Sequence, residues 1–160
     1  MKHMTWLTIL MVLLSGAAYA QPSIDKSVRN SLAWDKDNQR KADIISTVLV
    51  ATSLAVPCTV KDMRADSRWT CLENEGIRVG ISIAAAELVK HFVHRTRPNG
   101  SDNKSFYSEH TTIACAATLH TKAWEFCPAV GYLRVAANKH WVSDVGTGAA
   151  AGALLAFNFK

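Results

Sequence analysis

The spacing of apolar residues constrains the fold of this chain more than any other feature of its sequence. Between Glu75 and His94, apolar side chains recur at short intervals, at Ile77, Ile81, Ala84, Ala85, Leu88 and Val89. These intervals fit one face of an α-helix. Further apolar segments predict helices over residues 44–56, 109–124 and 141–157, and almost no part of the chain alternates as a β-strand does. The sequence therefore predicts an all-α fold, a compact helical bundle.

The last predicted helix is rich in glycine and alanine. Gly148 and Gly152 lie four positions apart within it. Small residues at this spacing allow two helices to approach closely. We therefore expect these glycines to serve tight packing inside the bundle.

Length and composition limit the classes of protein to which the chain can belong. It has 160 residues, the common size of one domain, and shows no repeat or interdomain linker. Hydrophobic residues make up 49% and charged residues 19%, which excludes a disordered chain. Lys and Arg exceed Asp and Glu by 18 to 13 without forming a run of like charges. This balance argues against a nucleic-acid partner, and it is compatible with an anionic substrate or peripheral contact with an anionic membrane.

Residues 1–20 have the organisation of a signal peptide. Lys2 and His3 form a short basic start, residues 6–14 are apolar, and Ala18-Tyr19-Ala20 matches a cleavage site. The apolar stretch is too short for a lasting membrane span, although an uncleaved N-terminal anchor is the alternative. We expect a single domain over residues 21–160 that is periplasmic or secreted after cleavage, with membrane association left open.

Four cysteines suit an exported protein, namely Cys58, Cys71, Cys115 and Cys127. An even number in an oxidising compartment indicates disulfides, and three pairings are open. The simplest pairing joins neighbours, Cys58 with Cys71 and Cys115 with Cys127. No C-x-x-C spacing is present in the sequence, so a thioredoxin-like or zinc-ribbon site has no support.

Two clusters of polar residues have a spacing suited to binding an anion. Lys90 and Arg97 lie seven positions apart, nearly two helical turns, beside a proline that ends the predicted helix. Ser108 and His110 stand where a loop becomes a helix, and the free N–H groups of a helix start attract anions.

A third cluster pairs a histidine with a carboxylate. His140 and Asp144 are four positions apart, so on a helix the carboxylate can accept the imidazole Nδ1–H. That contact leaves Nε2 free and more basic, ready to attack an electrophile. Arg134 adds a cation six residues before His140. Together the three clusters predict a phosphoryl site in which His110 protonates the leaving oxygen.

The three clusters resemble a known three-part signature, with K-x6-R-P at 90–98, S-x-H at 108–110 and R-x5-H-x3-D at 134–144. The signature is that of the type-2 phosphatidic acid phosphatase and vanadium haloperoxidase superfamily, and the resemblance covers residues 90–156. It implies an all-α bundle that hydrolyses phosphomonoesters or lipid-linked phosphates through a phosphohistidine, without metal or cofactor. By this resemblance His140 is the nucleophile, Asp144 orients it, and His110 is the general acid and later the base. The implied phosphate-binding residues are Lys90, Arg97, Ser108 and Arg134.

Three positions depart from the family pattern. Tyr107 stands where the family usually has proline, Glu109 where it has glycine, and Leu133 where it has serine. Glu109 brings a carboxylate to an anion site, and Leu133 removes one hydroxyl donor. We expect an active phosphatase with reduced activity or an altered leaving-group preference. The alternatives are a vanadate-dependent haloperoxidase and a weakly active phosphate-binding or interaction protein.

Overall fold

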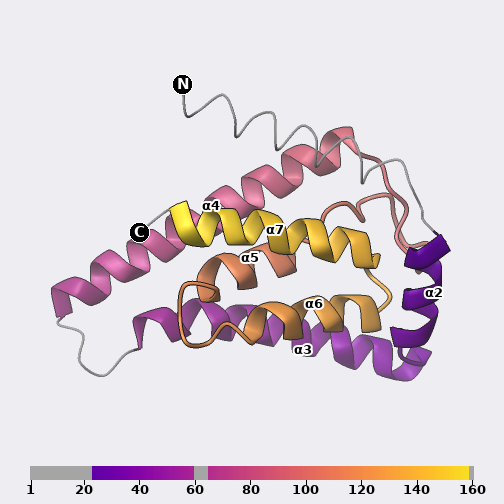
Figure 1. Cartoon of the computed structure of the whole chain (residues 1–160), viewed down its shortest axis with the longest axis horizontal. Helices are drawn as coiled ribbons and strands as arrows, with labels where there is room; N and C mark the ends of the chain where they lie inside the picture. Colours follow the sequence, from indigo (N-terminus) through magenta and orange to yellow (C-terminus); the bar gives the residue numbers. More distant parts are fainter. Residues whose placement is uncertain (1–22, 60–64, 159–160) are drawn as a thin grey trace.

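The computed structural model describes residues 23–59 and 65–158, and this part of the chain consists of helices and loops (Figure 1). In chain order the elements are α2 (Ser23–Leu32), α3 (Lys36–Ala55), the 3₁₀ turn η1 (Val56–Cys58), α4 (Ala65–Phe92), α5 (Glu109–Thr118), α6 (Phe126–Ala136) and α7 (Val142–Asn158). Within the described residues no strand forms, and Arg95 and Lys104 make an isolated bridge. The predicted all-α fold is confirmed. The predicted signal peptide, residues 1–20, lies outside the described residues.

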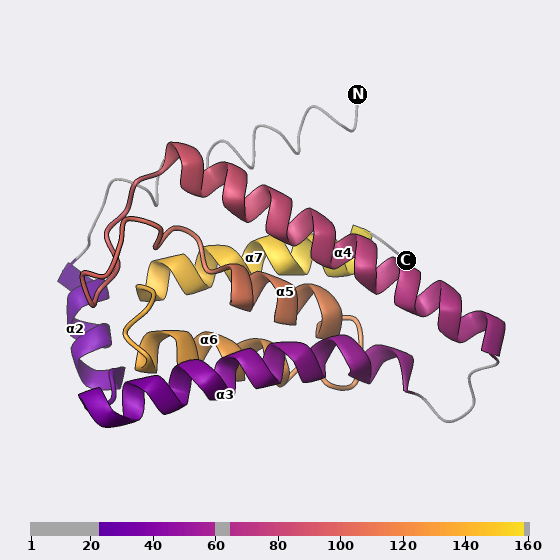
Figure 2. The same cartoon turned by 180° about the vertical axis from the view of Figure 1, so that it is seen from behind.

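Helix α5 is the centre of the bundle. It packs against α3, α4, α6 and α7, and it lies between the α4–α7 side and the α3–α6 side (Figure 1). Figure 2 shows the same order from behind. Residues 111–118 of α5 are all buried. Most of them are alanine, threonine or cysteine, and such small side chains let four other helices surround one.

Several helix boundaries differ from the predictions. Helix α3 begins at Lys36 rather than at residue 44, because the Asp35 side chain caps it by accepting the Asn38 N–H at 3.1 Å. The helix predicted over 109–124 ends at Thr118, and a separate helix, α6, follows a turn. Pro128 is tolerated because it stands in the first turn of α6. Helix α2 was likewise not predicted, whereas α7 begins and ends within one residue of its prediction.

Two disulfides join neighbouring elements of the bundle. Cys58 of η1 is bonded to Cys71 of α4, and Cys115 of α5 is bonded to Cys127 of α6. Both predicted pairings are confirmed. Disulfides are compatible with an oxidising, exported environment.

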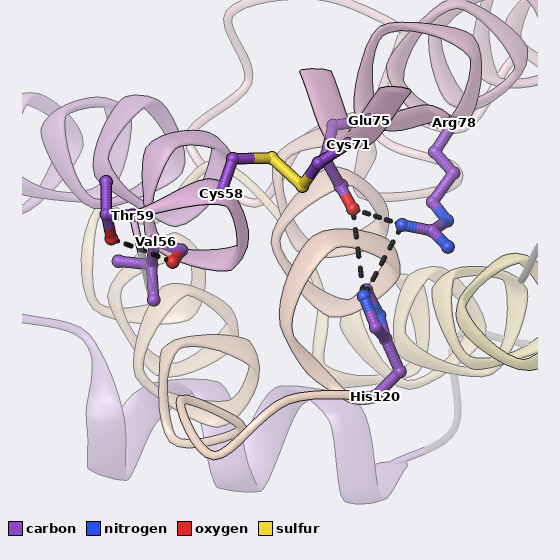
Figure 3. Close-up of a disulfide and its surroundings, with 7 residues drawn as sticks. All are labelled: Val56, Cys58, Thr59, Cys71, Glu75, Arg78 and His120. Atoms are coloured by element: carbon purple, nitrogen blue, oxygen red, sulfur yellow. Dashed lines mark hydrogen bonds and ion pairs between the residues drawn. A yellow bond between two sulfur atoms is a disulfide. The ribbon is translucent and has the colours of Figure 1, made fainter. Parts of the chain in front are cut away.

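A buried ion pair lies beside the first disulfide, between Glu75 and Arg78 of α4 (Figure 3). The Nε2 atom of His120, just after α5, lies 3.7 Å from Oε1 of Glu75. Burial raises the pKa of Glu75 and lowers that of His120. These contacts hold the first half of α4 against the end of α5.

The segment Lys36–Cys58 is long and apolar enough to cross a membrane, with a mean hydropathy of 1.4 over its most apolar window. One side of α3 packs against α5 and α6. The Ile44 and Val48 side chains, by contrast, are 55% and 57% exposed. Peripheral membrane contact is compatible with this apolar outer face, and it stays a prediction.

Glycines let the backbone of α7 touch the backbone of α5. A Cβ atom at Gly148 would lie 2.5 Å from the carbonyl oxygen of Ser108, and one at Gly152 would lie 2.5 Å from that of Thr112. Real side chains do not fit at such distances, so only glycine allows this approach. The tight packing predicted for both glycines is confirmed, and it places the start of α5 beside the start of α7.

We expect Gly152→Ala to lower the free energy of unfolding by about 1–3 kcal/mol, because α5 and α7 must move apart to make room. Gly146→Ala is the matched control in the same helix, since nothing lies within 4 Å of a Cβ atom there. Helix propensity alone should raise the stability of that variant by up to about 1 kcal/mol. Urea denaturation followed by circular dichroism measures both changes. Equal effects at the two positions would contradict the packing argument.

Candidate active site

The structure brings the three polar clusters together at one end of α5. Lys90 Nζ lies 2.6 Å from Oε2 of Glu109, at the start of α5. The Ser108 N–H donates to the carbonyl of Asp144 at 3.1 Å, which joins the second cluster to the third. Arg97 Nη1 donates to the carbonyl of Lys139 at 3.5 Å. These contacts connect Lys90, Arg97, Ser108 and Asp144 at this end of the bundle.

His140 is held as a neutral imidazole with one defined tautomer. It is 2% exposed, and its Nδ1–H donates to the backbone carbonyl of Ser105 at 2.6 Å. Since a carbonyl only accepts, the proton is on Nδ1 and Nε2 carries a lone pair. Burial, followed by the charges of Arg134 and Arg97, holds the pKa of His140 well below 6.5. The side chain therefore has the form that a nucleophile requires.

The predicted hydrogen bond from His140 Nδ1–H to the Asp144 carboxylate is wrong. His140 Nδ1 and Asp144 Oδ2 lie 4.0 Å apart, too far for a hydrogen bond. Asp144 Oδ2 instead accepts from the Ser105 hydroxyl at 2.5 Å and from the Trp141 N–H at 3.0 Å. The helical four-residue geometry fails because His140 precedes α7, which begins at residue 142. Asp144 orients His140 indirectly, by holding the residue whose carbonyl binds the imidazole.

Arg95 is a central residue of the site that the sequence analysis missed. It is 5% exposed, and it donates to Asp144 Oδ1 at 2.5 Å and to Asp25 Oδ2 at 2.7 Å. Asp25 belongs to α2, so this buried ion pair attaches α2 to the site. The sequence motif includes the neighbouring Arg97 and not Arg95. No local pattern distinguishes Arg95, because its acidic partners are 49 and 70 residues away in the sequence.

Arg134 is a buried cation whose hydrogen-bonding capacity is only partly used by its described neighbours. The side chain is buried, and its Nη1 donates to Asp43 and, at 3.1 Å, to the hydroxyl of Ser46. Among the described residues, the buried Nε of Arg134 has no hydrogen-bond partner. A buried guanidinium N–H without a partner is costly unless something else accepts its hydrogen bond.

His110 faces several charges of the site. Its Nε2 lies 3.5 Å from the Thr47 hydroxyl of α3. Burial and the positive charge of Arg134 lower the pKa of His110 to about 4, although Asp43 opposes them. The imidazole is therefore unprotonated near neutral pH when no anion is bound.

Ser108 is the residue immediately before α5, in the N-cap position, but its side chain makes no capping hydrogen bond. Its hydroxyl pairs instead with that of Thr111, 2.9 Å away, and both side chains are buried. The first N–H groups of α5 are thus left without a side-chain cap, which is the arrangement that attracts an anion to a helix start.

Two of the three residues that differ from the resembled signature, Leu133 and Tyr107, are buried in the core. Leu133 packs with Ala42, Ala136 and Ala137 between α3 and α6. Tyr107 packs with Ala86 and Phe106, and burial raises its pKa to about 12. The third such residue, Glu109, is not part of the core, because its carboxylate contacts Lys90 at the candidate site.

Comparison of the chain with protein-family models, with curated proteins and with solved structures finds no match. Within residues 23–59 and 65–158, no group of three His, Cys, Asp or Glu side chains is arranged to hold a metal ion.

The neutral His110 makes stability depend on pH. Its pKa is about 4 in the folded protein and near 6.5 in an unfolded chain. Its contribution to stability is therefore complete above about pH 6.5 and is lost as the pH falls toward 4. Between neutral pH and about pH 4, we expect the wild type to lose on the order of 2–3 kcal/mol more stability than His110→Gln. Urea denaturation over this range measures the difference, and parallel curves for the two proteins would contradict the buried neutral state.

Proposed function

We propose that this protein is a phosphatase that transfers a phosphoryl group to His140 and then to water. The observation that carries the proposal is the state of His140, whose Nδ1 is bound to the Ser105 carbonyl while Nε2 is free. Two arginines, Arg134 and Arg97, lie near enough to depress its pKa. A buried nucleophile with a fixed tautomer, next to cations that attract phosphate, suits phosphoryl transfer. The resemblance of the three motifs to the phosphatase signature supports the same reaction.

The reaction has two balanced steps. In the first, His140 Nε2 forms a bond to phosphorus while the bond to the leaving oxygen breaks, and His110 gives that oxygen a proton. In the second, His110 takes a proton from water, the water oxygen bonds to phosphorus and the phosphorus–nitrogen bond breaks. Lys90, Arg97 and Arg134 balance the charge on the other phosphoryl oxygens.

The acid step depends on raising the pKa of His110. In the empty site that pKa is about 4, too low for proton donation at neutral pH. A bound phosphate places negative charge near the imidazole, which favours its protonated form. We therefore expect the enzyme to work best on the acidic side of neutrality.

Asp144 is a positioning residue in this scheme. It accepts hydrogen bonds from the Ser105 hydroxyl and the Trp141 N–H, and thereby fixes the carbonyl of Ser105 that selects the tautomer of the nucleophile.

One observation favours the alternative of a phosphate-binding protein with weak activity. Lys90, Arg97 and Arg134 each already contact a carboxylate, on Glu109, Asp102 and Asp43. The vanadate-dependent haloperoxidase also stays an alternative prediction.

We also infer that the protein acts outside the cytoplasm after loss of residues 1–20, which the two disulfides support.

We expect His140→Ala to lose activity by about a thousandfold or more, because the attacking atom is removed. Asp144→Asn should lose less, because it alters the support of the imidazole and keeps its Nε2. Phosphate release from an aryl phosphate measures both effects. Labelled phosphoryl-enzyme, trapped by alkaline quench, should form in the wild type and be lost in His140→Ala. Undiminished turnover in that variant would remove His140 from the nucleophilic role.

For His110→Ala, we expect a loss of about 10²–10⁴-fold on alkyl phosphates and a much smaller loss on aryl phosphates, whose leaving groups need little protonation. The wild type should lose alkyl-phosphate activity as the pH rises, because His110 gives up its proton, and the variant should lack this decline. Rates on both substrate types across the pH range test the assignment. An equal loss on both types with an unchanged profile would exclude His110 as the acid.

A further inference from the structure

Each of the three cations assigned to phosphate already has a carboxylate partner. Lys90 Nζ contacts Glu109 Oε2 at 2.6 Å, Arg97 Nε contacts Asp102 Oδ1 at 2.7 Å, and Arg134 Nη1 contacts Asp43. The two histidines add no positive charge at neutral pH, because the pKa of each is depressed. The site is therefore close to electrically balanced before a ligand arrives.

Glu109 is the partner that most affects a ligand. Asp102 is 44% exposed and Asp43 34%, whereas Glu109 is 22% exposed and contacts a lysine side chain that is 8% exposed. Solvent therefore screens the Glu109 carboxylate least. As the first residue of α5, Glu109 also carries one of the N–H groups at the helix start to which an anion is attracted.

The charge of Glu109 extends beyond Lys90. Its carboxylate acts on the Arg134 guanidinium, favouring the charged form of that side chain, and it raises the pKa of Tyr107. A phosphoryl group between Lys90 and Arg134 would therefore lie within the field of this carboxylate. Each further negative charge on the group adds to its repulsion from Glu109, which remains in contact with Lys90.

We propose that Glu109 makes this site selective for phosphoryl groups that carry one negative charge, such as phosphodiesters and singly ionised monoesters, over doubly ionised phosphates. The inference rests on the proposed phosphate site and names the substrate class that the site favours. Like charges brought together in a partly buried site repel strongly, so the carboxylate selects against the dianion without touching the reacting atoms.

The test compares two small anions of similar shape at one pH. At about pH 8, dimethyl phosphate carries one negative charge and methyl phosphate carries nearly two, since the second ionisation of a phosphate monoester lies near 6. Isothermal titration calorimetry of the full chain gives Kd for each anion. In the wild type, we expect dimethyl phosphate to bind at least as tightly as methyl phosphate.

Glu109→Gln removes the charge and keeps the size of the side chain and an oxygen that can contact Lys90. We expect this variant to shift the ratio of the two Kd values toward methyl phosphate by about tenfold or more. Glu87→Gln is the matched control, because Glu87 also contacts Lys90, at 2.8 Å, but is 53% exposed. It should shift the ratio less than about threefold. Urea denaturation verifies that both variants are folded.

The outcomes separate this inference from the proposed reaction. A shifted ratio in Glu109→Gln without any turnover supports the selectivity and contradicts the phosphatase. Turnover with an unchanged ratio overturns the selectivity alone, since Glu109 would then move away as the anion binds. An equal shift of the Kd ratio in Glu87→Gln would mean that removing any negative charge near Lys90 has this effect, and it would also overturn the inference. Failure of both anions to bind either protein would overturn the phosphate site and the inference with it.

Discussion

The buried carboxylate of Asp144 joins the segments that meet at the candidate site. Its side chain accepts hydrogen bonds from Arg95, Ser105 and the Trp141 N–H, and its backbone carbonyl accepts the Ser108 N–H. A carboxylate with no exposed surface costs several kcal/mol unless it is paired, and burial raises its pKa even with these partners. The fold must therefore bring the loop after α4 and the starts of α5 and α7 to one point.

Close packing of α5 and α7 makes that convergence possible. Gly148 and Gly152 allow the two backbones to touch, so the Ser108 N–H reaches the Asp144 carbonyl. Arg95 then extends the network to Asp25 of α2. The rigid part of the site is thus built from backbone contacts and buried ion pairs, and the imidazole of His140 is oriented by a carbonyl inside that network.

The carboxylates that neutralise the cations of the site stabilise the fold, and by the proposed function they also weaken the attraction for an anion. The partly buried cations Lys90 and Arg134 would destabilise the empty protein without Glu109 and Asp43 beside them. In the proposed phosphatase, the same carboxylates would share those cations with the bound phosphate. In the family that the motifs resemble, glycine usually stands at the position of Glu109. The selectivity that we propose for the site is assigned to this one residue at the start of α5.

The sequence by itself determined the features that depend on local spacing. Apolar periodicity predicted most of the helices, and neighbouring cysteines predicted both disulfides. The three motifs predicted polar clusters that the Lys90–Glu109 and Ser108–Asp144 contacts join. Local spacing failed for α2, for the break between α5 and α6, and for the acceptor of the His140 proton. Only the tertiary structure decided the partners. Asp43 and Arg134 are 91 residues apart, and Asp25 and Arg95 are 70 apart. Such pairs form because burial forces each charge to find an opposite one, and which residue is near enough depends on how the helices pack.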